Sequence, residues 1–127
     1  MENNQFVNGP GHWAIEDVRT GKCIGGVGFR NHQSWHKKAE IGFVISKDYW
    51  RQGITSLCVN AVLDFAFCQK DFNRIEARVD PRHEACIGLL KKFGFKKEGL
   101  LRDCEFEHGH FVDLEVYSLL KREYSTL

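Results

Sequence analysis

A polar turn around Gly53 has the residue types that hold phosphate. It follows a segment of alternating residues (40–45) and precedes a segment with apolar residues at helical spacing (54–67). Glycine can adopt a positive φ and lets another molecule approach the backbone closely. A strand that leads through such a turn into a helix leaves unpaired N–H groups and a positive dipole end pointing outward, a geometry that binds phosphate. An ordinary strand–helix connection has the same unpaired N–H groups and the same dipole end. The turn alone is therefore compatible with a phosphate site and with a plain connection.

Cysteine and histidine residues are the other groups that could do chemistry, through a metal or a disulfide. No cysteine or carboxylate stands at ligand spacing from His32 and His36 or from His108 and His110, so we expect no metal. We expect the first pair in a loop and the second in a turn. The cysteines are odd in number and form no C-x-x-C pair, which favours reduced thiols and a cytoplasmic protein. They stand at Cys23, Cys58, Cys68, Cys86 and Cys104.

Length and charge limit the classes of protein that the chain can belong to. A chain of 127 residues with 43% hydrophobic residues can build the core of one domain. Its formal net charge of +1 gives no bulk attraction to nucleic acid or a membrane. The polar residues 1–12 lack the pattern of a signal peptide, and no apolar run approaches transmembrane length. We expect a single domain over residues 1–127, with residues 1–12 as a flexible lead.

Hydrophobic periodicity predicts six strands and two helices. The expected strands are residues 13–18, 23–30, 39–46, 73–79 and the two arms of a hairpin over residues 100–121 that turns at His108 and Gly109. The second helix has Asp80 as N-cap and Pro81 as first residue, and it ends at Gly94. The first helix is expected over residues 54–67, with an apolar stripe made of Ile54, Leu57, Cys58, Ala61, Val62, Phe65 and Ala66.

The order β-β-β-α-β-α-β-β predicts an α+β fold, a mixed and mainly antiparallel sheet flanked by helices. Only the connections through the two helices can be parallel crossovers. In such sheets ligands bind where neighbouring strands diverge, at the ends that lead into the helices. The turn at residues 50–56 and the helix start at residues 80–86 are therefore expected beside one cleft.

Four segments in a particular order resemble a known family. They are AEIGFVIS (39–46), YWRQGITS (49–56), NRIEARVDPRHEACIGLLKKFGF (73–95) and EGLLRDCEFEHGHFVDLEVYSLL (98–120). With them, residues 13–124 resemble the GNAT superfamily of acetyl-CoA-dependent N-acetyltransferases, in its RimJ/RimL branch. The resemblance implies the acyl-CoA N-acyltransferase fold, acetyl-CoA as cosubstrate and a primary amine as acceptor. The acceptor could be a protein N-terminus, a polyamine, an antibiotic or another small amine.

Members of that family usually begin with one further strand and a helix or helix pair. The hairpin that follows these elements begins here at Trp13, so the resemblance implies an N-terminally shortened fold. The missing elements normally help to form the acceptor-binding wall. We expect a homo-oligomer, because another chain could cover the apolar surface left open.

The resemblance also implies the CoA site. Its pyrophosphate turn corresponds to residues 50–55, with Thr55 where Gly or Ala is usual, and the threonine side chain narrows the approach to the backbone. The pantetheine arm would lie along residues 43–45, whose backbone groups would bind it like an added strand. The implied CoA-binding residues are Phe43, Val44, Ile45, Trp50, Arg51, Gln52, Gly53, Ile54, Thr55, Ser56, His83 and Cys86.

For catalysis, the resemblance implies Glu40 as a general base that acts on the amine through water. The acid that protonates the leaving thiolate is open, because Leu90 stands where many members have tyrosine. The branch's Asn-x-x-Ser pattern corresponds to His83 and Cys86. Cys86 is either the donor or a small buried residue. His83 is either a second donor or a helix-start residue.

Two other functions remain open. Cys86 with His83 as base could form an acyl-enzyme, although no orienting third group stands at recognisable spacing. A shortened domain could also bind acyl-CoA or a partner chain without turnover. Thiol release with acetyl-CoA and a panel of amines would distinguish an enzyme from such a binding module.

Overall fold

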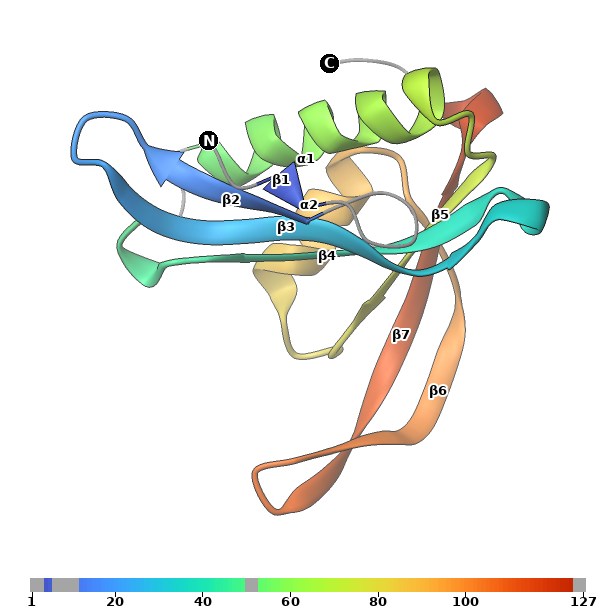
Figure 1. The fold of residues 1–127 in the computed structure, drawn as a ribbon. Helices are drawn as coiled ribbons and strands as arrows, with labels where there is room; N and C mark the ends of the chain where they lie inside the picture. Colours follow the sequence, from blue (N-terminus) through green and yellow to red (C-terminus); the bar gives the residue numbers. More distant parts are fainter. Residues whose placement is uncertain (1–3, 6–11, 50–52, 125–127) are drawn as a thin grey trace.

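A seven-stranded sheet runs through the residues that the computed structural model describes, which are 4–5, 12–49 and 53–124 (Figure 1). The strand order is β1-β2-β3-β4-β5-β7-β6. The strands are β1 (Asn4–Gln5), β2 (His12–Asp17), β3 (Lys22–Gln33), β4 (Lys38–Ile45), β5 (Arg74–Val79), β6 (Lys96–Glu107) and β7 (His110–Leu120). The helices are α1 (Ile54–Asp64), which continues into a π-helical turn at Phe65–Gln69, and α2 (Glu84–Lys92). None of the helices in these residues has the length and apolar run to cross a bilayer.

Only β4 and β5 pair in parallel, and the other neighbours among the described strands are antiparallel. The crossover between β4 and β5 runs through α1, as parallel pairing requires. The predicted α+β fold class and the mainly antiparallel sheet are confirmed. On β4, Ile41 is buried while Val44 is 73% exposed, so the predicted alternation of faces also holds.

The core lies between the two helices and one face of the sheet. Side chains from both helices belong to the same buried cluster as those of β3, β4, β5 and β7, so both helices cover the same face. The largest fully buried side chains are Tyr117, Phe67, Leu63, Ile75, Leu90, Leu119 and Val59. The opposite face of β4 and β5 carries charged residues instead, and no described helix contributes to it.

The buried stripe of α1 differs from the prediction. The helix buries Val59, Val62 and Leu63, and the π-helical turn buries Ala66 and Phe67. Leu57 is 73% exposed and Ala61 is exposed. Apolar residues surround most of the helix, so periodicity alone could not select the face. The π-helical turn, in which Lys70 N–H donates to the Phe65 carbonyl, then rotates the following residues.

The predicted start of α2 was also wrong. The N-cap of α2 is His83, whose Nδ1 accepts from the Cys86 N–H at 3.2 Å. Asp80 instead accepts from the Arg82 N–H at 2.9 Å and closes a local turn before the helix. In the expected lead of residues 1–12, Asn4–Gln5 pair with β2, and β2 begins at His12. The expected helix end at Gly94, with φ +91°, is confirmed.

The hairpin of β6 and β7 extends away from the rest of the sheet (Figure 1). The hairpin turns at His108 and Gly109, as predicted, and both residues have a positive φ. Strand β6 pairs with β7 alone, and its register shifts twice, near Gly99 and between Leu101 and Glu105. Within the second shift, Asp103 has φ +46° and donates its N–H to the Asp113 carboxylate.

We predict that Leu63→Ala lowers the free energy of unfolding by about 2–5 kcal/mol, because it leaves a cavity at a fully buried position. Leu57→Ala is the matched control on the same helix and should change it by less than about 0.5 kcal/mol, because Leu57 is exposed. Urea denaturation of both variants measures the difference. Equal losses would contradict the observed orientation of α1.

Candidate functional site

The parallel ladder between β4 and β5 stops after three pairs, and a cavity opens where it stops. The last pair is Glu40 with Glu76. Beyond it lies a cavity of about 410 Å³ that residues of both strands line. The cavity is lined by His12, Gly26, Gly28, Phe29, Arg30, Ile41, Gly42, Phe43, Val44, Ala77, Arg78 and Cys86.

The lining comes from both faces of the sheet. Phe29, Ile41 and Ala77 belong to the core between sheet and helices. Gly28 and Gly42 are register partners whose missing side chains would lie on the opposite face. The His12 ring covers Gly28, because a Cβ added there would clash with it, whereas Gly42 leaves bare backbone. A Cβ added at Gly42 would meet no atom within 4 Å. The cavity therefore takes its lining from both faces of the sheet at the point where β4 and β5 stop pairing.

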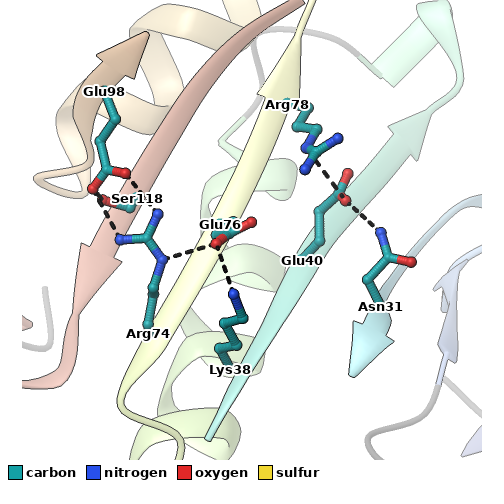
Figure 2. Close-up of polar contacts among 8 residues, drawn as sticks. All are labelled: Asn31, Lys38, Glu40, Arg74, Glu76, Arg78, Glu98 and Ser118. Carbon is teal, nitrogen blue, oxygen red and sulfur yellow. Dashed lines mark hydrogen bonds and ion pairs between the residues drawn. The ribbon is translucent and has the colours of Figure 1, made fainter. Parts of the chain in front are cut away.

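Glu40 lies at the end of the ladder and is only 3% exposed. Its Oε2 accepts from Nε and Nη2 of Arg30 at 3.0 and 2.8 Å, and its Oε1 accepts from Asn31 Nδ2 at 2.9 Å. Arg78 Nε lies 3.9 Å from Oε1 (Figure 2). A carboxylate has about four lone-pair positions. Three are taken by these donors, so the fourth, on Oε1, can accept a proton from a water or an amine.

A second charged cluster lies next to Glu40 on the same face (Figure 2). Arg74 donates to Glu76 at 2.8 Å and to both oxygens of Glu98 at 2.9 and 2.6 Å. These bonds from Arg74, with a further one from Ser118, lower the pKa of Glu98 to about 2. The alternation of charge on β5 was visible in the sequence, but these partners come from β6 and β7 and were not.

Cys86 lines the cavity, but its thiol is a weak acid there. Burial raises the pKa of Cys86 to about 11. His83 is exposed and accepts from the Cys86 backbone N–H, which makes it the N-cap of α2. The helix-start role of His83 is therefore the one that the geometry favours.

The phosphate turn is described only in part. Trp50, Arg51 and Gln52 lie outside the described residues. Gly53 has φ +76° and precedes the first turn of α1, in which its carbonyl accepts from the Leu57 N–H at 3.1 Å. A Cβ added there would meet no atom of the described residues within 4 Å, so these residues leave the backbone open to a ligand. Ile54, Thr55 and Ser56 form the first turn.

Two contacts that the sequence did not predict hold this turn. Lys92, near the end of α2, donates to Ser56 Oγ at 3.0 Å and brings a cation beside the start of α1. On the other side, Tyr49 donates its hydroxyl to Asp17 at 2.9 Å. Hydrogen bonds from Arg19, followed by this one from Tyr49, lower the pKa of Asp17. The described residues on either side of residues 50–52 are therefore linked to α2 through Ser56 and to the end of β2 through Tyr49.

Comparison with known proteins identifies the family. A match to the acetyltransferase (GNAT) domain covers residues 1–96. The chain belongs to the GNAT acetyltransferase family. It is 41% identical to the uncharacterized N-acetyltransferase p20 of Bacillus licheniformis over 98% of this chain and 71% of p20. It is 32% identical to the putative ribosomal N-acetyltransferase YdaF of Bacillus subtilis over 82% of this chain and 57% of YdaF.

Among solved structures, the ribosomal-protein-S5-alanine acetyltransferase of Vibrio fischeri superposes with a TM-score of 0.85 at 25% identity. The match covers 91% of this chain and 63% of that GNAT protein. The predicted family and fold are confirmed, and the predicted RimJ/RimL branch agrees with this neighbour. Of the predicted site residues, the structure brings Phe43, Val44 and Cys86 into one cavity, with Glu40 beside it.

We predict that the stability of the fold depends on pH through Glu98. A folded pKa of about 2, below the ordinary 4.5, means that ionised Glu98 stabilises the fold above pH 4.5. This contribution is lost as the pH falls through 2. The melting temperature of Glu98→Gln should therefore lie below that of the wild type above pH 5, and the difference should shrink toward pH 2. A difference independent of pH would show that the Arg74–Glu98 pair does not contribute through charge.

Proposed function

We propose that this chain transfers the acetyl group of acetyl-CoA to a primary amine by direct attack. The observation that carries the proposal is the cavity that passes between β4 and β5, because it lets a thioester and an amine meet from opposite faces of the sheet. Membership of the GNAT family supports the same reaction. The alternative, a module that binds acyl-CoA without turnover, has the same fold and differs in its chemistry.

Acetyl-CoA would lie along β4 and end at Gly53. Residues 41–45 pair with β3 on one side, and their ladder to β5 has already stopped, so their other edge can bind the pantetheine amides. A free amide there would polarise the thioester carbonyl. The start of α1, together with Lys92, would hold the pyrophosphate.

In the chemical step, the amine nitrogen attacks the thioester carbon and the carbon–sulfur bond breaks. The amine must first lose a proton, and Glu40 can take it through water at the open position on Oε1. Protonation of the departing thiolate by Cys86 is unfavourable. An ordinary thiol has a pKa of about 8.5, so Cys86, with a pKa of about 11, is the weaker acid. We assign Cys86 to the wall of the thiol pocket.

The cellular setting is part of the proposal. All five cysteines lie within the described residues and each is a free thiol, which supports a cytoplasmic protein. The homo-oligomer that the sequence suggested stays a prediction, which light scattering over a dilution range checks. The exposed apolar side chains it would cover include Phe106 and Phe111 on the hairpin.

We predict that acetyl-CoA raises the melting temperature, because a ligand that binds only the folded state stabilises it. Gly53→Val should abolish most of this shift by blocking the approach to the backbone. Gly109→Val is a matched control, since Gly109 also has a positive φ and open space around it but lies in the hairpin turn. Loss of the shift in both variants would point to strain rather than to the phosphate site.

We predict that Glu40→Gln lowers kcat by ~10²–10⁴-fold while the Kd of acetyl-CoA stays nearly constant, because glutamine keeps the shape but accepts no proton. A higher pH should partly restore the rate, since more of the amine is then deprotonated. Cys86→Ala and Cys86→Ser should retain most of the activity. An active Glu40→Gln beside an inactive Cys86→Ala would reverse the two assignments.

A further inference from the structure

The cavity carries more positive than negative charge. Arg30 and Arg78 both line it, and the described lining residues include no Asp or Glu. The carboxylate in contact with these arginines is Glu40, which is 3% exposed and lies beneath them. Two guanidinium groups over one buried carboxylate leave the mouth of the cavity with a net positive charge.

Of the two arginines that line the cavity, Arg78 uses less of its hydrogen-bonding capacity. Arg74, on the same face of β5, donates to Glu76 and Glu98 at 2.6–2.9 Å. Arg78, by contrast, has one ion pair among the described residues, 3.9 Å from Glu40 Oε1, an oxygen that already accepts from Asn31. Its side chain is 37% exposed. A guanidinium has five N–H donors in a fork that matches a carboxylate.

We propose that the acceptor amine carries a carboxylate close to the amino group, and that Arg78 binds this carboxylate. The inference rests on the proposed acetyl transfer and names the acceptor class for the same site. The spacing supports a short separation, because Arg78 Nε lies only 3.9 Å from the carboxylate oxygen that would receive the proton of the amine. The acceptor therefore resembles an amino acid.

The same charges exclude a polyamine. A chain with several ammonium groups would face two arginines, and the carboxylate beside them, Glu40, already pairs with both. Such repulsion is a means of specificity. The positive field also favours the neutral form of the attacking amine over its ammonium form. Binding of the carboxylate and activation of the amine thus come from one arrangement of charges.

The test compares amine acceptors with and without a carboxylate next to the amino group. L-alanine and L-alaninamide share the amine, and spermidine represents polyamines; thiol release from acetyl-CoA gives kcat/KM for each. We expect L-alanine to exceed both others at least tenfold. Arg78→Gln should abolish this preference, bringing kcat/KM for L-alanine down to that for L-alaninamide, while Arg78→Lys should retain part of it. Arg82→Gln is the control, because exposed Arg82 pairs with Asp80 and does not line the cavity.

Each outcome decides one of the two claims. Faster acetylation of L-alaninamide or spermidine than of L-alanine would overturn the inference and keep the proposed function. An unchanged preference in Arg78→Gln would also overturn it. Should acetyl-CoA bind while none of the amines is acetylated, the proposed transfer fails and the inference falls with it. Product inhibition by N-acetyl-L-alanine, but not by its amide, gives a second readout that Arg78→Gln should remove.

Discussion

The early end of the β4–β5 ladder is the constraint on which the rest of the structure depends. Up to Glu40 and Glu76 the two strands share hydrogen bonds, and beyond that pair each strand keeps only its outer neighbour, β3 for β4 and β7 for β5. Backbone groups that a continuous sheet would use internally are thereby left for a ligand. Helix α1, which connects the two strands, begins beyond the far end of β4.

The end of the ladder is closed by charge rather than by apolar packing. Glu40 is buried there with donors from β3 and from β5, so it joins strands on both sides of β4. Removing a carboxylate from water is costly, and such groups add little net stability even when they are paired. The arrangement fixes where the donors of Arg30 and Arg78 lie. A reaction that moves a proton needs this precision more than it needs stability.

The sequence was sufficient for features that depend on neighbouring residues. Alternation on β4 and β5, the glycines at the two turns, and the order of the elements all follow from local preferences. The partners of Glu40 could not be predicted, because Arg30, Asn31 and Arg78 come from strands whose register is set by the whole sheet. The prediction of the buried face of α1 failed for a related reason. Apolar residues lie on several faces of this helix, and packing against the sheet determines which of them is buried.

The two register shifts of β6 affect how the molecule behaves toward its neighbours. A long outer strand normally offers a row of free N–H and C=O groups on which another chain can extend the sheet, the first step of edge-to-edge aggregation. On β6 that row is interrupted near Gly99 and again before Glu105, where Asp103 turns its N–H back to Asp113 on β7. A second molecule therefore finds an interrupted template on the outer edge of β6, which disfavours growth of the sheet from that edge.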